Sequence, residues 1–118
     1  MRRGTTPLHK FYIDADLSDV EVLYITYSQN GDVVLEKSLE DGDVVLDAEK
    51  KMITTRLTQA ETLLFESDDD YYTNSGFAKS LGSKNVKVQV RWRTRLDRAY
   101  ATDIVVTSVN EILKDGEI

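Results

Sequence analysis

The sequence predicts an all-β fold, an antiparallel β-sandwich of about seven strands with one short helical turn. The first observation is the run from Val86 to Arg95, where valines and Trp92 alternate with basic and polar residues, as in a strand with one buried face. The second is the run from Val20 to Ser28, which is rich in β-branched and aromatic residues. The third is the series of further short β-rich runs, separated by turn-forming residues, along the rest of the chain.

The first half of the chain holds five expected strands. Asn30-Gly31 supplies the positive φ angles that a tight turn needs, so the second and third strands should form a hairpin. Asp41-Gly42-Asp43 marks the turn before the fourth strand. The five expected strands are Leu8 to Ile13, Val20 to Ser28, Val33 to Lys37, Val44 to Asp47 and Met52 to Leu57.

One helical turn is expected from Thr58 to Phe65. Thr58 and Glu61 have the three-residue offset of a capping box, in which each side chain bonds to the other residue's amide. The same offset between Ser18 and Glu21 precedes a strand-like run, so the pattern alone does not decide. We expect the apolar residues that follow Thr58 to close one end of the sandwich; they are Leu63, Leu64 and Phe65.

The second half predicts another hairpin. Val86 to Arg95 is followed by the short link Leu96-Asp97-Arg98 and by a β-rich run from Tyr100 to Val109. Trp92 shares the apolar face of its strand with three valines, which predicts a core residue. The number and spacing of the strands favour an immunoglobulin-like sandwich, built as a single domain from residues 1 to 118.

Composition excludes several classes of protein. The chain has 118 residues and no cysteine, so disulfides, thiolate metal sites and cysteine nucleophiles are ruled out. The basic start from Met1 to Pro7 lacks the apolar stretch of a secretory signal, and no run approaches the roughly 20 apolar residues of a membrane span. The formal net charge of −6 disfavours free nucleic acid as the main partner.

Basic residues gather on the strand that contains Trp92. The residues Lys87, Arg91, Arg93 and Arg95 alternate with its apolar positions and should form a row on one face. Such a row could dock an acidic surface of another subunit, since the guanidinium fork matches carboxylates. The favoured interpretation is ion pairing within the same sheet, for which the expected partners are Asp103, Glu21 and Glu36.

Catalytic and metal sites have weak support. The single histidine, His9, has no recognisable serine or cysteine partner, and no phosphate-binding glycine loop occurs. Two acidic clusters could offer oxygens to calcium, but they lack the glycine and distal glutamate of an EF-hand loop, so solvated acids are the favoured reading. These clusters are Asp14, Asp16 and Asp19, and Asp68-Asp69-Asp70. No cofactor and no metal site is predicted.

The stretch from Glu66 to Asn85 has little periodicity and is long for a loop of a compact domain. Its aromatic and small polar residues are typical of contact loops, with Tyr71, Tyr72 and Phe77 as candidate partner-binding residues. The alternative is a structural insertion in which Phe77 and Leu81 turn into the core.

Several stretches together resemble a group of small proteins encoded by temperate phages and prophages. Leu57-Thr58-Gln59-Ala60-Glu61-Thr62 and Leu113-Lys114-Asp115-Gly116 are the more specific in combination. The others are Arg2 to Pro7, Tyr24 to Gly31, Val88 to Arg91 and the rest of the closing Ile112 to Ile118. The chain is also similar to the N-terminal sandwich domain of phage baseplate upper proteins. The resemblance implies no catalytic residues.

These observations together lead us to expect a non-enzymatic phage or prophage structural protein, associated with a tail or baseplate and acting through protein–protein contacts. Self-association into a homo-oligomer is one form of such contacts, and neither nucleic acid nor membrane is an expected partner. The resemblance implies assembly in the host cytoplasm, with the finished virion as a possible destination. The alternative is a soluble prophage-encoded module that binds or regulates a host protein.

Overall fold

A computed structural model describes residues 1–66 and 85–109, which form eight β-strands and one short helix. The expected all-β sandwich is confirmed. The elements are β1 (Leu8–Tyr12), β2 (Val20–Gln29), β3 (Asp32–Ser38), β4 (Val44–Asp47), β5 (Met52–Arg56), α1 (Gln59–Thr62), β6 (Val86–Thr94), β7 (Ala99–Ala101) and β8 (Val105–Thr107).

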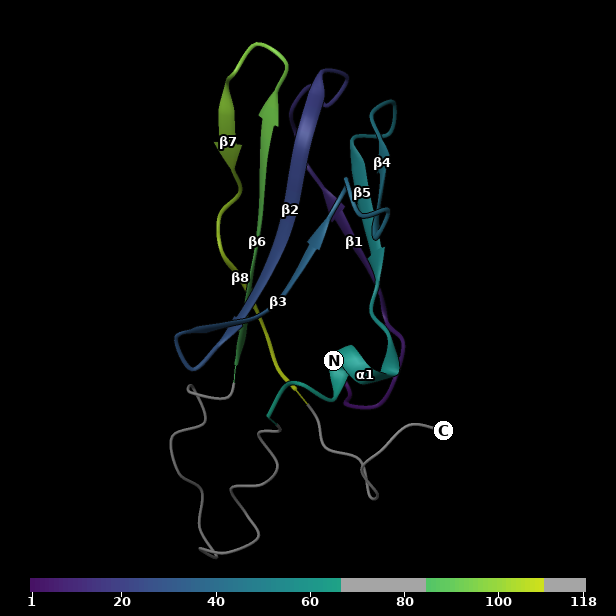
Figure 1. The fold of residues 1–118 in the computed structure, drawn as a ribbon, viewed down its shortest axis with the longest axis vertical. Helices are drawn as coiled ribbons and strands as arrows, with labels where there is room; N and C mark the ends of the chain where they lie inside the picture. The colour runs from purple at the N-terminus through teal and green to yellow at the C-terminus, as the bar shows by residue number, and fades with distance from the viewer. Residues whose placement is uncertain (67–84, 110–118) are drawn as a thin grey trace, which may run out of the picture.

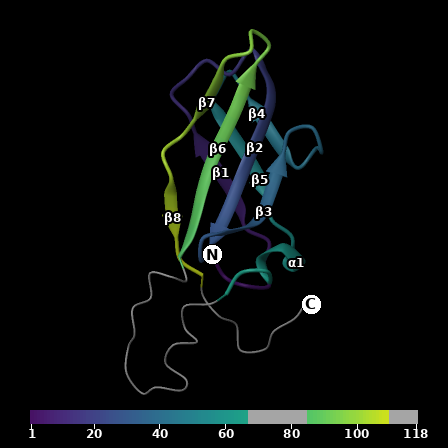
Figure 2. The same cartoon turned by 60° about the vertical axis from the view of Figure 1, so that its left-hand side comes forward.

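The strands form two sheets, and every pairing is antiparallel. The small sheet has the order β1-β5-β4, and the large sheet has the order β3-β2-β6-β7, with β8 also paired to β6. These orders correspond to strands B-E-D and C′-C-F-G of an immunoglobulin-like sandwich. Figures 1 and 2 show the two sheets, with β7 and β8 following one another along the outer side of β6.

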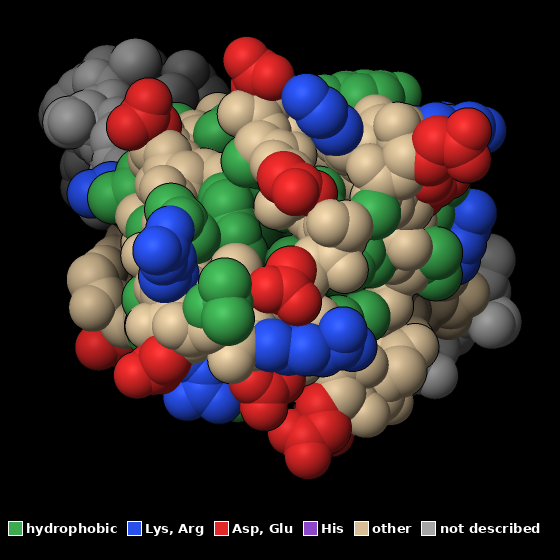
Figure 3. All heavy atoms as spheres, turned by 90° about the horizontal axis from the view of Figure 1, so that it is seen from above, with side chains coloured by type: hydrophobic (Ala, Val, Ile, Leu, Met, Phe, Trp, Pro, Cys, Tyr) green, Lys and Arg blue, Asp and Glu red, His purple; other side chains and the backbone are tan. Residues whose placement is uncertain are grey.

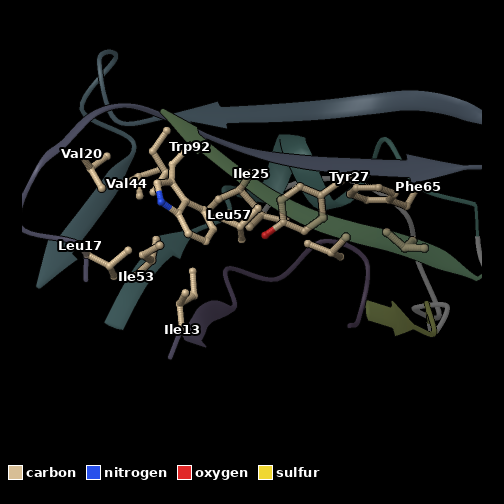
Figure 4. Close-up of a cluster of buried hydrophobic side chains, with 14 of the residues drawn as sticks. Ile13, Leu17, Val20, Ile25, Tyr27, Val44, Ile53, Leu57, Phe65 and Trp92 are labelled. Carbon is tan, nitrogen blue, oxygen red and sulfur yellow. The ribbon is translucent and has the colours of Figure 1, made fainter. Parts of the chain in front are cut away.

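The hydrophobic core lies between the two sheets. The large sheet contributes the alternate residues of β2 and β6, and Trp92 is only 6% exposed, so its predicted place in the core is confirmed. The small sheet contributes Val44 and Ile53, and the loop before β2 contributes Leu17. Figure 4 shows these side chains meeting around the indole of Trp92 and, further along, around Tyr27 and Phe65.

The expected strand from Tyr100 to Val109 is interrupted. From Ala101 to Val105 the chain advances by four positions, whereas the facing span of β6, from Arg91 to Val88, covers only three. The extra residue makes a bulge at Thr102, where the Thr102 hydroxyl accepts a hydrogen bond from the Val90 amide at 3.1 Å. A single strand was therefore a wrong expectation, and two short strands stand in its place.

Two tight turns depend on residues with positive φ. Asn30 and Gly31 both have positive φ, 57° and 84°, which confirms the hairpin expected between β2 and β3. The β6–β7 turn has no glycine, and Asp97 takes the left-handed position instead, with φ of 59°. Aspartate tolerates this region better than most residues, so a glycine is not required.

The expected capping box is present at α1. The Thr58 hydroxyl accepts from the Glu61 amide at 3.1 Å, and the Glu61 carboxylate accepts from the Thr58 amide at 2.8 Å. Phe65 is fully buried and closes one end of the core as expected, but Leu64 is exposed, so that part of the expectation is wrong. Leu63 is half-buried and does not join the core, so Phe65 alone of these three residues closes the end of the sandwich. No helix among the described residues is long and apolar enough to cross a membrane.

Candidate functional site

The outer face of the large sheet carries the row of basic residues on β6. The inward residues of β6 are buried valines and Trp92, so the intervening side chains of Lys87, Arg91 and Arg93 project from the opposite face. The side chains of Arg91 and Arg93 are 55% and 48% exposed. The period-two pattern in the sequence therefore placed this row correctly.

Most of these basic residues lie near acids of the same chain. Arg91 lies 3.6 Å from Glu36 of β3, and Arg93 lies 4.0 Å from Glu21 of β2. These two pairings confirm the favoured interpretation from the sequence. Arg95 pairs with Asp19 at 3.8 Å, whereas Asp103 forms no ion pair with a described residue, so that part of the prediction is wrong.

These ion pairs are long and leave the guanidinium groups available. At 3.6–4.0 Å the nitrogen–oxygen distances exceed those of charge-assisted hydrogen bonds. Within residues 1–66 and 85–109, neither Arg91 nor Arg93 donates a side-chain hydrogen bond. The Glu36 carboxylate instead accepts a hydrogen bond from the Thr26 hydroxyl at 2.9 Å. Exposed pairs of this kind contribute about 0–1 kcal/mol, so another carboxylate could displace them.

A shallow groove of about 520 Å³ lies beside the two arginines. It exists because Ala99 and Ala101 of β7 stand opposite Arg93 and Arg91 and have side chains too small to fill the face. The residues of β2 that line the groove are Val22 and Tyr24. No pattern in the sequence predicts this groove, because two alanines form a hollow only when their strand partners are known.

A second hollow, of about 260 Å³, lies near the same edge and is lined by residues that include Trp92, Leu96 and Tyr100. The rings of Trp92 and Tyr100 stack with centroids 5.6 Å apart. The indole Nε1–H of Trp92 is buried and has no hydrogen-bond partner. Figure 4 shows this nitrogen on the side of the ring nearer Leu17 and Val20. Figure 3 looks down on this end of the molecule, where apolar side chains show between charged ones.

The outer edge of the large sheet is apolar. Ile104, Val105 and Val106 are 56%, 55% and 54% exposed, and Tyr100 is 48% exposed. Consecutive exposed apolar residues on an edge strand are uncommon in a protein that works alone, since the edge invites pairing with another chain. Tyr100 belongs both to this edge and to the lining of the groove, so the two features adjoin each other there.

His9 is positioned by a structural contact. Its Nδ1 lies 2.7 Å from the hydroxyl of the buried Tyr27, and the two rings are 5.7 Å apart. Burial, helped by the positive charge of the N-terminus, lowers the pKa of His9 below 6.5. Burial, together with the charge of Glu61, also raises the pKa of the Tyr27 hydroxyl.

The carboxylates of the Asp14–Asp19 loop have separate partners. Asp16 accepts hydrogen bonds from the amide and hydroxyl of Ser18, and these bonds lower its pKa. Asp14 lies 3.5 Å from Lys51, and Asp19 faces Arg95. No group of three or more acids or histidines within the described part of the chain could hold a metal ion. Asp68, Asp69 and Asp70 lie outside the described residues, as do Tyr71, Tyr72 and Phe77.

The comparisons with known proteins add no family to this picture. No protein-family model matches the sequence. A search of curated proteins also finds no match.

Proposed function

We propose that the chain is a non-catalytic structural or assembly protein of a phage or prophage, associated with the tail or baseplate and acting through protein–protein contacts. The observation that carries the contact role is the surface described above, in which two half-exposed arginines, a groove and an uncovered apolar edge adjoin one another. Arginine, tyrosine and exposed sheet edges are typical of protein interfaces. The resemblance of the sequence to small temperate-phage proteins supports the phage setting.

Two features support a role without catalysis. An acid–base pair of carboxylates needs one group with a raised pKa, whereas the pKa values of the Asp16 and Glu61 carboxyls are both lowered. The lone histidine has a lowered pKa and hydrogen-bonds a core tyrosine. The acids beside the basic row also weaken the positive field that nucleic acid would require.

The test uses the full-length purified chain and the tail and baseplate proteins encoded next to it. Light scattering and electron microscopy should show rings, stacks or a defined complex. Added salt should weaken that association, because screening acts on the exposed arginines. The variant R91E/R93E should associate less well, while K50E, a charge reversal on an exposed turn, serves as the control.

Two results would contradict this proposal, one of them in full and the other in part. A monodisperse chain that ignores the neighbouring tail proteins and captures a host protein would replace this proposal with the alternative, a soluble prophage-encoded binding module or regulator. Association that is insensitive to salt and to R91E/R93E would remove the arginine surface from the proposal.

A further inference from the structure

The free edge of β7 has unpaired backbone groups next to the groove. Thr94 donates its amide to the Arg98 carbonyl at 2.9 Å, and Thr102 donates to the Val90 carbonyl at 2.9 Å, so the backbone groups of residues 98 and 102 point toward β6. Backbone groups alternate in direction along an antiparallel strand, so those of Ala99 and Ala101 point away from β6. Within residues 1–66 and 85–109, no strand lies on that side of β7.

The same strand has a hollow on each of its two faces. The outer groove reaches the side chains of Ala99 and Ala101, and the inner hollow reaches the ring of Tyr100. A neighbouring strand would send alternate side chains to the two faces of the sheet. Long side chains of one additional strand could reach across the two alanines into the groove on one face, and past Tyr100 into the hollow on the other.

We infer that β7 accepts an extended segment of a partner protein as an added antiparallel strand, with acidic side chains at the positions that face the outer groove. This inference rests on the proposed function and names the partner's chemistry. The partner's side chains should be acidic because two arginines lie near this edge. Arg91 and Arg93 are on β6, the strand paired with β7, and their guanidinium groups make no hydrogen bonds to described residues. The positions of the partner that face inward lie beside Tyr100 and Leu96, which favours apolar side chains there.

The opposite edge of the same sheet is less suited to this role. On β3, Lys37 points inward, and its side chain is only 5% exposed. An inward charge on an edge strand is a device that discourages it from pairing with another chain. The edge residues of β7 and β8 include no charged side chain.

The probe is a short synthetic peptide in which glutamate alternates with valine, titrated into the full chain. The control peptide has lysine in place of glutamate. The chain contains one tryptophan, so the indole N–H signal of Trp92 in an NMR spectrum, together with the anisotropy of a labelled peptide, reports binding at this edge. The glutamate peptide should bind and shift the Trp92 signal, and the lysine peptide should not.

Two variants and one modified peptide separate the parts of the inference. R91E/R93E should weaken binding by about tenfold or more, whereas K50E should not. A101P removes an amide that points away from β6, so it should abolish binding and leave the β6 pairing intact. If A101P does not fold, the N-methylated glutamate–valine peptide tests the same backbone hydrogen bonds between β7 and the peptide, since it cannot donate them.

Several outcomes would overturn the inference. They are equal binding of the lysine peptide, full binding by R91E/R93E, full binding of the N-methylated peptide, or no binding of the glutamate peptide at all. If the chain still assembles with tail proteins in any of these cases, the proposed function stands and the docking edge lies elsewhere. Failure to assemble with tail proteins removes the proposed function whatever the peptide does.

Discussion

The ammonium group of Lys37 donates hydrogen bonds to both carboxylate oxygens of Glu61, each at 2.7 Å. Lys37 belongs to β3 and Glu61 to α1, so this pair joins the edge of the large sheet to the helix at the end of the sandwich. The lysine side chain is 5% exposed and the glutamate side chain 21%. The capping box holds Glu61 in place for this contact, because the same carboxylate also accepts from the Thr58 amide.

Removing the charge of Glu61 should leave a buried ammonium without its counter-ion. We expect E61Q to lower the free energy of unfolding by about 3 kcal/mol, the lower end of the range for breaking a buried pair. Urea unfolding of E61Q and of the wild type measures this loss. The double variant K37M/E61Q removes the stranded charge and should recover much of the loss. An E61Q protein as stable as the wild type would show that the pair adds nothing.

The same contact predicts a dependence of stability on acid. Burial alone would raise the pKa of Glu61, but the hydrogen bonds from Lys37 and Thr58 outweigh it and hold the pKa below 4.5. The stability from this group is therefore complete above pH 4.5 and is lost as the pH falls through the lower, folded-state pKa. Urea midpoints measured on either side of pH 4.5 should fall less steeply for E61Q than for the wild type.

His9 adds a second pH dependence at a higher range. Because its folded-state pKa lies below 6.5, the unfolded chain takes up the proton first as the pH falls. The contribution of His9 to the stability of the fold is therefore complete above pH 6.5 and is lost as the pH falls through the lower, folded-state pKa. NMR titration should give an apparent pKa under 6.5 for His9. The free energy of unfolding of H9Q should lack the part of the pH dependence that comes from this group. A titration at or above 6.5 would contradict the burial of the ring.

Trp92 should be the most costly side chain to truncate. It contacts both the core and the stacked ring of Tyr100, so W92A should lower the free energy of unfolding by about 3–5 kcal/mol. W92F should cost much less, since it keeps a ring in the core and removes the indole N–H that has no partner. Thermal and urea unfolding compare the two, and equal losses would mean that the ring volume is not what matters.

The bulge at Thr102 should depend on its hydroxyl. T102V leaves the Val90 amide without its acceptor, and an unsatisfied buried group costs about 1–3 kcal/mol. T102S keeps the hydroxyl and is the matched control. Hydrogen exchange at the Val90 amide should become faster in T102V and stay slow in T102S. Unchanged exchange in T102V would show that another acceptor replaces the hydroxyl.

Much of the fold could be predicted because single strands leave local marks. The alternation around Trp92, the turn at Asn30-Gly31 and the capping box at Thr58 each follow from neighbouring residues alone. The surface was harder to predict, because it depends on which strands become neighbours. Ala99 and Ala101 look unremarkable in the sequence and define a groove only when they lie opposite Arg93 and Arg91. The split at Thr102 was missed for the same reason, since a bulge is a mismatch between two strands.

The two edges of the large sheet differ in a way that limits how many neighbours each subunit can hold. On β3 the side chain of Lys37 points inward, whereas no described strand pairs with the outer side of β7, whose residues are uncharged. A subunit with one accepting edge in this sheet can bind one added strand there. The joined sheet then cannot continue through the opposite edge of the same subunit. Such a subunit suits a cap or adaptor of fixed stoichiometry better than a repeating fibre.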